Sequence, residues 1–506
     1  MTYSPEKQVY KIADTNPTLV RHKPWCIVSE EIKIRKVDLE KLGIVIEEEY
    51  EITDTDIELI GFDEKRLSFD PKCRIPSVMV RSEQPQQIGK LARALDKIGV
   101  PHSLSNIKYN ARVSLDFSSE IFRIKVPAIT YYTPDEISEV LRAVLDGLPR
   151  IRLTVMDIEV EASGSFPKRG SRVLLVGLLH GDLAGNYELE VLEGDEIFEV
   201  VSRVLDKTPH YLVTYNGIGF DLPYLKAYLK NYNVLGVEKK GFRFGNRIAP
   251  CLDLYLLSKN FASSLGVKST IARSLVRVSK ELGLISSEEE MIERSIDYTR
   301  IGEIYERDRE KLIEYLKTDL ELTYRIALRW IPVLIILYII SGISPWSLQE
   351  LPSMGSLAEY SLSEYLLRKY SVAFPVRNRK LVYEEEGDLP IYGRGHKTLA
   401  KRGIYSNVLQ LDFDMLYPTI YYLYKVDPSG VDSTPKITHG DAFIVPLKRI
   451  DGKGERFTTI ARFKGGMVHE FFTYMVNLRR LTKKLKKSAE KEIADLFTIA
   501  DQGVKI

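Results

Sequence analysis

The stretch that most constrains the fold is I-R-L-T-V-M-D-I-E-V, residues 151–160, in which apolar and polar residues alternate. Such alternation predicts a β-strand, and residues two apart in a strand point to the same face. Asp157 and Glu159 therefore share a face, where two carboxylates repel each other and are costly to cover. Two interpretations remain open. Either a divalent cation offsets the pair, or the strand lies at the margin of a sheet and water solvates both acids.

The segments after this strand predict a mixed α/β domain. We expect strands at 172–180, 187–192 and 211–215, a turn at Gly181-Asp182, and helices at 193–206 and 222–230. Strands followed by alternating helix and strand are typical of an α/β or mixed-sheet domain. Residues 286–341 are expected to be nearly all helical, with helices continuing to 369.

The amino-terminal part is predicted to be a separate mixed region. Short strand-like runs occur at 27–34, 44–52 and 75–81, and a helix is expected at 87–98. The turn sequence D-G-L-P at 146–149 is a candidate boundary. With 506 residues the chain is too long for one core, and about three domains are expected.

Composition indicates a soluble globular protein, with 44% hydrophobic and 28% charged residues. The net charge of +2 predicts no nucleic-acid binding by itself, so any basic surface must be local. Cys26, Cys73 and Cys251 lie far apart and indicate neither a disulfide framework nor a zinc site.

No membrane segment is expected. The most hydrophobic run, W-I-P-V-L-I-I-L-Y-I-I at 330–340, is too short to span a bilayer and contains Pro332, so a buried helix is predicted. The opening M-T-Y-S-P-E-K lacks the apolar core of a signal peptide. We therefore expect a cytoplasmic, nucleoid-associated protein with no membrane partner.

Two further acidic motifs follow the first. L-V-T-Y-N-G-I-G-F-D-L-P-Y-L at 212–225 places Asp221 at the start of a helix, where an N-cap role is the alternative interpretation. Y-L-K-T-D puts Tyr315 and Asp319 on one helix face, and the alternative there is a surface pair near Lys311 or Arg325.

Together the three motifs supply four hard oxygen ligands. That set suits two divalent cations, Mg²⁺ or Mn²⁺, which activate a water and stabilise the leaving 3′ oxygen in phosphodiester hydrolysis. The order D-x-E, N-x-x-x-F-D and Y-x-x-x-D resembles the proofreading 3′–5′ exonuclease domain of family B DNA polymerases. The likeness to archaeal members extends over essentially the whole chain, through residues 78–95, 109–116, 251–255 and 340–360.

The resemblance implies roles for the motif residues. Tyr315 would orient the attacking water, and Asn216 and Phe220 would contact DNA. The two metal ions would be bound by Asp157, Glu159, Asp221 and Asp319.

The fold class that the resemblance implies is an α/β multidomain chain. A mixed-sheet amino-terminal domain would occupy 1–148, and a ribonuclease H-like 3′–5′ exonuclease domain 149–345. A helical connection and the first part of the palm would occupy 346–460. Residues 461–506 would form the first part of the fingers.

A second site is implied by L-D-F-D-M-L-Y-P-T-I at 411–420, whose alternating start predicts a strand and which resembles polymerase motif A. Asp412 and the carbonyl of Phe413 would then bind catalytic Mg²⁺. Leu416 and Tyr417 would contact the incoming deoxynucleoside triphosphate, with the Tyr417 ring excluding a 2′-hydroxyl. Asp414 falls outside the motif pattern.

Other segments resemble parts of the same polymerase site. Y-G-R-G-H at 392–396 is similar to a degraded Tyr-Gly-Gly motif, which implies that Tyr392 and Gly393 contact single-stranded template. The segment 477–491 carries seven basic residues and one acid. It is either a solvated charged helix or a fingers helix whose candidates for contact with the triphosphate are Arg479 or Arg480 together with Lys483 or Lys484. D-Q-G-V-K-I at 501–506 resembles the start of motif B and makes Lys505 a phosphate contact.

The D-T-D motif that carries the second polymerase carboxylate does not occur at the corresponding place in these 506 residues. Three explanations stay open: a separate carboxy-terminal subunit, an interrupted gene, or a part of a longer protein. We expect a DNA polymerase with a proofreading exonuclease that binds primer-template and single-stranded DNA, a carboxy-terminal polymerase fragment and a sliding clamp. A non-catalytic DNA-binding scaffold and a stand-alone 3′–5′ exonuclease are the alternatives.

Overall fold

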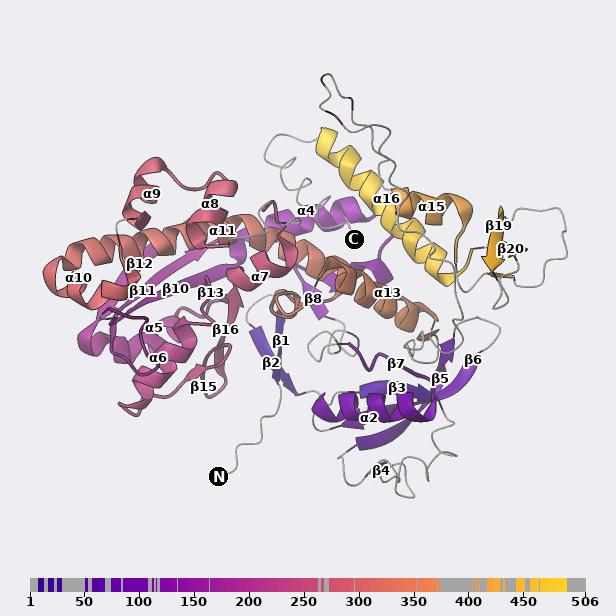
Figure 1. The fold of residues 1–506 in the computed structure, drawn as a ribbon, viewed down its shortest axis with the longest axis horizontal. Coiled ribbons are helices and arrows are strands. Elements are labelled where there is room, and N and C mark those ends of the chain that lie inside the picture. The colour runs from indigo at the N-terminus through magenta and orange to yellow at the C-terminus, as the bar shows by residue number, and fades with distance from the viewer. Residues whose placement is uncertain are drawn as a thin grey trace. The chain divides into compact units, whose positions relative to one another are not determined.

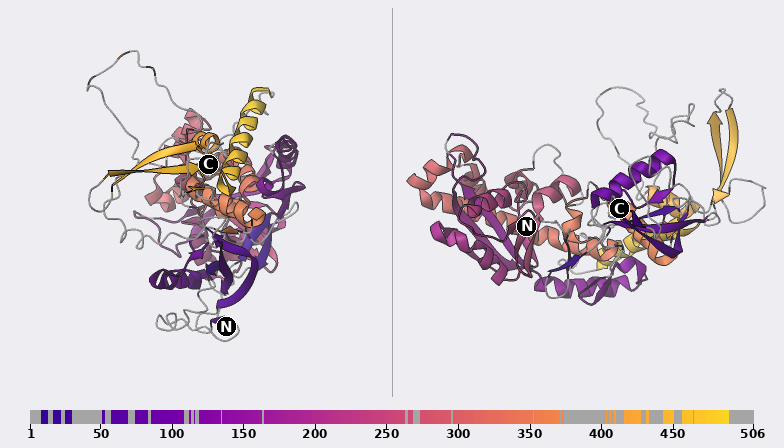
Figure 2. Two further views of the ribbon diagram at one scale, coloured as in Figure 1. Left: turned by 90° about the vertical axis from the view of Figure 1, so that its right-hand side faces the viewer. Right: turned by 90° about the horizontal axis from the view of Figure 1, so that it is seen from below.

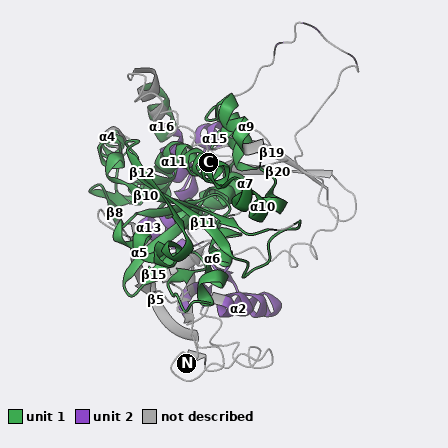
Figure 3. Ribbon diagram, turned by 90° about the vertical axis from the view of Figure 1, so that its left-hand side faces the viewer, with its two compact units in different colours: residues 1–22, 108–361, 478–506 green, residues 23–107, 362–477 purple. Residues whose placement is uncertain are grey.

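A computed structural model describes most of residues 85–373, apart from short gaps, and several segments on either side. Those outer segments are 8–12, 17–21, 25–29, 51–52, 57–68, 74–82, 416–427, 431–432, 443–450, 456–463 and 465–488. The gaps inside 85–373 are 108–111, 113–114, 116–118, 134, 163, 263–264, 268–272, 295, 352 and 371. The chain divides into two compact units, shown in Figure 3, and each is described by itself. The first comprises 1–22, 108–361 and 478–506, and the second 23–107 and 362–477.

The first unit is built on a seven-stranded mixed sheet with the order β12-β11-β10-β13-β16-β15-β14. Strand β10 is antiparallel to β11 and parallel to β13, which is itself parallel to β16. The predicted mixed α/β fold is confirmed. The strands are β10 (Arg152–Val160), β11 (Val173–Asp182), β12 (Tyr187–Glu193), β13 (Tyr211–Thr214), β14 (Val237–Glu238), β15 (Gly241–Phe244) and β16 (Arg247–Asp253).

Strand β10 lies inside this sheet, between β11 and β13, and not at its margin. The interpretation that Asp157 and Glu159 sit on a marginal strand is therefore wrong. The strand prediction for 151–160 is otherwise confirmed nearly to the residue. The expected turn at Gly181-Asp182 is displaced. Both residues end β11, and the Asp182 carboxylate instead accepts hydrogen bonds from the backbone N–H groups of Ala184 and Asn186 in the turn that follows.

One face of the sheet is covered by α5 (Val200–Asp206) and α6 (Asp221–Lys230) (Figure 1). Met156, Ile158 and Val160 of β10 point to this side and join a buried apolar cluster with residues of both helices. The single helix expected at 193–206 is divided. Its first part is the 3₁₀ segment Gly194–Glu199, and only the second part is α-helical.

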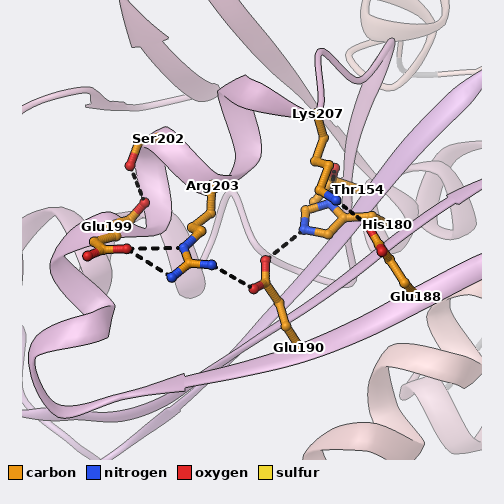
Figure 4. Close-up of polar contacts among 8 residues, drawn as sticks. All are labelled: Thr154, His180, Glu188, Glu190, Glu199, Ser202, Arg203 and Lys207. Atoms are coloured by element: carbon orange, nitrogen blue, oxygen red, sulfur yellow. Dashed lines mark hydrogen bonds and ion pairs between the residues drawn. The ribbon is translucent and has the colours of Figure 1, made fainter.

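A polar network crosses the first three strands on the α5 side, as Figure 4 shows. Thr154 Oγ1 lies 2.9 Å from His180 Nδ1, and His180 Nε2 lies 3.0 Å from Glu190 Oε1. Arg203 of α5 pairs with Glu190 and also with Glu199. Thr154 is fully buried, and the network runs from it to the partly exposed Glu190 and Arg203, so it joins β10, β11, β12 and α5.

The other face of the sheet is covered by α11 (Arg309–Ser341), which lies on the opposite side of the strands from α5 and α6 in Figures 1 and 2. Gly177 of β11 permits the close approach of this helix. A Cβ atom at Gly177 would lie 2.5 Å from Leu320 Cδ1 and 3.0 Å from Leu316 Cγ. Gly177 is the cross-strand partner of Asp157, so the two residues share the face that α11 covers.

Within the described part of the chain, α11 is the one helix long and apolar enough to cross a membrane, and 83% of its apolar window is buried in the protein. It is a core helix, as predicted from residues 330–340. The expected run of helices up to residue 369 is confirmed. Its members beside α11 are α9 (Ser287–Arg294), α10 (Ile301–Arg307), α12 (Pro345–Leu348) and α13 (Met354–Tyr370).

The remaining elements of the first unit surround this sheet. They are the pairs β1 (Gln8–Ile12) with β2 (Pro17–Arg21) and β8 (Ser119–Ile121) with β9 (Ile124–Val126), and the helices α4 (Ile137–Gly147), α7 (Leu254–Phe261) and α8 (Leu275–Glu281).

The second unit contains a sheet with the order β17-β5-β6-β3-β7, to which β4 adds by pairing with β5. Helix α2 packs on it through a buried apolar cluster that includes Ile88, Leu91 and Val80. The strand expected at 75–81 and the helix expected at 87–98 are confirmed as β6 and α2. The elements are α2 (Pro85–Ile98), β3 (Trp25–Ser29), β4 (Glu51–Ile52), β5 (Ile57–Ser68), β6 (Arg74–Ser82), β7 (His102–Ser103) and β17 (Val372–Ala373).

The carboxy-terminal elements include a small antiparallel sheet with the order β18-β20-β19. Its strands are β18 (Val431–Asp432), β19 (Phe443–Ile450) and β20 (Arg456–Phe463), and the helices on either side are α15 (Leu416–Tyr424) and α16 (Met467–Ser488).

The start of β10 is fixed against β13 by the buried side chain of His210. The His210 backbone N–H donates to Arg152 O at 2.9 Å, and His210 Nδ1 accepts from the Arg152 N–H at 3.1 Å. Burial, helped by the charge of Arg152, lowers the pKa of His210 to about 4. The ring is therefore neutral in the folded protein at pH 5, while the same ring in the unfolded chain is protonated.

This difference predicts a pH-dependent stability. As pH falls from 7 to 5, the unfolded chain gains a proton at His210 that the folded protein does not take up, so His210 alone removes on the order of 2 kcal/mol of stability. In His210→Asn, Oδ1 can replace Nδ1 as the acceptor without titrating. We expect the unfolding temperature of the wild type to fall more between pH 7 and pH 5 than that of His210→Asn. Equal pH dependence in the two proteins would contradict this.

Candidate active site

The first two acids of the site lie in the carboxyl half of β10. Asp157 is half-buried opposite Gly177, and Glu159 is 4% exposed opposite Leu175. The register of β10 and β11 shifts between Glu159 and Val160. Both carboxylates therefore lie where the regular pairing of the central strand ends, on the side that α11 covers.

The third acid follows a sharp turn after β13. Asn216 has a left-handed backbone, with φ of 71°, and its carbonyl accepts hydrogen bonds from the N–H groups of Gly219 and Phe220 at 3.0 and 2.9 Å. The turn lets α6 begin directly at Asp221.

Asp221 is not the N-cap of α6, so the capping interpretation is wrong. The N-cap is Phe220, which makes no side-chain capping bond, and Asp221 lies in the first turn. Its side chain is directed inward and is only 2% exposed. Among the described residues, no hydrogen-bond donor reaches the buried Asp221 Oδ2. The positive end of the helix dipole favours its charge, but one oxygen of the carboxylate still lacks a donor there.

Tyr315 and Asp319 lie on α11, as predicted. Tyr315 is 3% exposed, and its hydroxyl donates to the hydroxyl of Tyr298 at 3.3 Å. Arg325 binds Glu289 and Glu321. The interpretation of a surface tyrosine is therefore wrong. The face of α11 that carries Tyr315 is turned into the protein.

Three of the acids lie within electrostatic reach of one another. Burial raises the pKa of Asp157 well above its usual value, and the charge of Asp319 adds to this. Burial also raises the pKa of Asp221, with contributions from Asp157, Asp253 and Asp319. Carboxylates from β10, α6 and α11 thus repel one another in a covered place, where a cation would stabilise all of them.

The donor set fits a hard divalent cation such as Mg²⁺ or Mn²⁺. Carboxylate oxygens are the ligands that these ions prefer, and Asp221 Oδ2 is a buried acceptor without a donor in the described structure. No group of three or more His, Cys, Asp or Glu side chains among the described residues is already arranged to hold an ion.

A fifth acid, the buried Asp253, was not singled out in the sequence as a site residue. It ends β16, is 1% exposed, and accepts hydrogen bonds from the backbone N–H groups of Asn216 and Ile218 at 2.9 and 3.0 Å. The only sequence signal is an acid at the end of the apolar run in C-L-D-L-Y. Asp253 is also the N-cap of α7, where it accepts from the Tyr255 N–H, but its partners Asn216 and Ile218 lie far away in the chain, and no side-chain pattern reveals them.

The residues predicted for the polymerase site are partly described. Leu416 and Tyr417 begin α15 and are exposed, Tyr417 by 73%. Arg479 and Lys483 lie half-buried on α16. Asp412, Phe413, Tyr392, Gly393 and Lys505 lie outside the described residues.

Comparison with known proteins identifies the superfamily that the domain with this sheet resembles. Residues 156–331 match the model of the RNase H superfamily. The chain is 28% identical over 302 residues to DNA polymerase 2 of Aeropyrum pernix, covering 56% of this chain and 35% of that protein. It is 26% identical over 272 residues to the DNA polymerase of Thermococcus gorgonarius, covering 49% and 33%. The matched segments thus span about a third of the length of these relatives.

A solved structure shows the same fold over nearly the whole chain. The family B DNA polymerase from the hyperthermophilic archaeon Pyrobaculum calidifontis superposes with a TM-score of 0.63 at 20% sequence identity. The match covers 99% of this chain and 66% of that one.

Gly177 offers a test of the close packing beneath the acids. We expect Gly177→Ala to destabilise the first unit by about 1–3 kcal/mol, because the new methyl group meets the fully buried Leu316 and Leu320. Gly89→Ala in α2 is the matched control. Nothing lies within 4 Å of a Cβ there, so a small stabilisation is expected. Thermal unfolding of both variants measures this. An unchanged unfolding temperature for Gly177→Ala would show that α11 does not pack closely on β11.

Proposed function

We propose that this chain, which has an RNase H superfamily domain and the fold of the amino-terminal portion of a family B DNA polymerase, carries the two-metal 3′–5′ exonuclease of such an enzyme. The observation that carries the proposal is that Asp157, Asp221 and Asp319, from three separate elements, lie within electrostatic reach of one another. As in the domain division inferred from sequence, residues 149–345 would be the exonuclease domain.

The proposed chemistry is hydrolysis of the last phosphodiester bond at a 3′ end. Two bound Mg²⁺ or Mn²⁺ ions would supply an activated water and stabilise charge on the leaving oxygen. Asp157, Asp221 and Asp319 would hold the ions, with Glu159 beside them on the same strand face. The Tyr315 hydroxyl is fixed by the Tyr298 hydroxyl, which suits it to orient a water.

The loop before α6 is suited to single-stranded DNA. Phe220 is partly exposed and stacks on Tyr224, with ring centroids 4.3 Å apart and 30° between the planes. A base can stack on such a pre-ordered aromatic surface without sequence preference. The exposed Asn216 lies in the same loop and offers an amide to the strand.

Asp157→Ala tests the exonuclease. We expect it to reduce Mg²⁺-dependent release of nucleotides from the 3′ end of single-stranded DNA by on the order of 10²-fold or more, because one ligand of the metal pair is lost. Asp182→Ala is the control, since Asp182 lies opposite Arg152 at the other end of β10. Robust digestion by Asp157→Ala would refute the assignment of the site.

We also propose that the carboxy-terminal part contributes to nucleotidyl transfer. Asp412 and the carbonyl of Phe413 would bind Mg²⁺, and Leu416 and Tyr417 would contact the deoxynucleotide. Its triphosphate would be bound by Arg479, Lys483 and Lys505, and single-stranded template by Tyr392 and Gly393. Primer-template DNA would be one partner, and a sliding clamp would be a second. The protein would act in the cytoplasm, at the nucleoid.

Nucleotidyl transfer by two metal ions needs a second carboxylate besides Asp412. We expect the 506 residues alone to incorporate no deoxynucleotide into a primed template in the presence of Mg²⁺. Addition of a polymerase segment that carries the second carboxylate, from the same protein or from another subunit, is expected to restore primer extension. Template-directed extension by the 506 residues alone would contradict this proposal.

A further inference from the structure

We propose that Asp253 is a positioning residue for the exonuclease site, which fixes the turn from Asn216 to Ile218 and thereby the start of α6 at Asp221. The inference rests on the proposed exonuclease function. Asp253 touches neither DNA nor a reacting atom in this account, and it acts through the backbone of the turn.

Both oxygens of Asp253 are engaged by backbone N–H groups. Oδ1 accepts from Asn216 at 2.9 Å and from Tyr255 at 3.0 Å, and Oδ2 accepts from Ile218 at 3.0 Å. Asp221 differs, because its buried Oδ2 has no donor within the described structure. Two buried acids in electrostatic contact thus have different roles, since Asp221 offers an oxygen to a ligand and Asp253 has none to offer.

The turn needs such an anchor. Asn216 has a left-handed backbone, which residues other than glycine adopt rarely, although Asn tolerates it better than most. Gly217 packs against Thr214 and leaves no room for a side chain there. The Asn216 carbonyl closes the turn by accepting from the Gly219 and Phe220 N–H groups, and the two amides that point at Asp253 anchor the turn to the end of β16. The Leu222 N–H then donates to Gly217 O at 2.9 Å, which joins the turn to α6.

Asp253 is itself held from the opposite side by Gln349, which follows α12. The Asp253 N–H donates to Gln349 Oε1 at 2.8 Å, and Gln349 Nε2 donates to Cys251 O at 3.1 Å. The Asn260 side chain donates to Gln349 O at 3.2 Å. Gln349 is buried, so its amide completes a continuous connection from α12 through the end of β16 to the turn.

Asp253→Asn breaks this connection with little change in size. The amide keeps one acceptor oxygen, but its NH₂ group then faces a backbone N–H that it cannot accept. We expect hydrogen exchange at the Ile218 amide to accelerate, the dissociation constant for Mn²⁺ to rise about 10- to 100-fold, and kcat for 3′ nucleotide release to fall by a similar factor. KM for single-stranded DNA should change by less than about threefold, since the loss is of metal geometry and not of strand contact.

Two further variants keep the test decisive. Gln349→Met removes the support of Asp253 without touching the carboxylate, and it should shift the same three measurements in the same direction by a smaller factor. Asp182→Asn is the matched control, because Asp182 also accepts two backbone N–H bonds in a turn, at the far end of β10. It should leave Mn²⁺ affinity and kcat unchanged.

The outcomes separate the inference from the function on which it rests. If Asp157→Ala digests DNA like the wild type, the proposed exonuclease fails and this inference fails with it. If Asp157→Ala is inactive while Asp253→Asn and Gln349→Met keep wild-type exchange, Mn²⁺ affinity and kcat, the positioning role alone is overturned. Loss of a bound Mn²⁺ in Asp253→Asn with unchanged Ile218 exchange would also overturn it, because Asp253 would then be a metal ligand.

Discussion

The repulsion among carboxylates that the fold covers wholly or in part is the constraint on which the rest of the first unit depends. Asp157 reaches a covered position because its strand lies inside the sheet and Gly177 lets α11 approach it. Asp221 and Asp319 add their charges from two helices, and burial raises the pKa of Asp157 and Asp221. Such an arrangement lowers the free energy of unfolding unless a cation binds. Mutual repulsion of covered charged groups is typical of functional sites.

The surrounding packing supplies the stability that the acids do not. Apolar side chains of β10 pack on α5 and α6, while the apolar half of α11 is buried over its length. Other polar residues fix the strands and turns around the acids. His210 fixes the start of β10, the His180 network joins three strands, and Asp253 occupies its oxygens with amides. Within the described structure, these contacts leave Asp221 Oδ2 as a buried oxygen of the site that no donor reaches.

The sequence allowed much of this site to be predicted, because its signals are local. Alternation located β10, and i, i+4 spacing placed Tyr315 and Asp319 on one helix face. Three interpretations proved wrong: a marginal strand, an N-cap at Asp221 and a surface Tyr315. Each of them depends on what covers the residue, which is a tertiary property. Asp253 and Gln349 escaped prediction because their partners are largely backbone atoms distant in sequence. Asp412 and Lys505 fall outside the described residues, so their roles remain predictions.

The central claim is that Asp157, Asp221 and Asp319 form a divalent metal site. Isothermal titration of the protein with Mn²⁺, compared with Asp221→Asn, tests it without reference to activity. The account predicts that the wild type binds two ions and that Asp221→Asn binds fewer or binds them at least about tenfold more weakly, because a ligand oxygen has been replaced by an amide. Equal binding by both proteins, or no binding by the wild type, would contradict it.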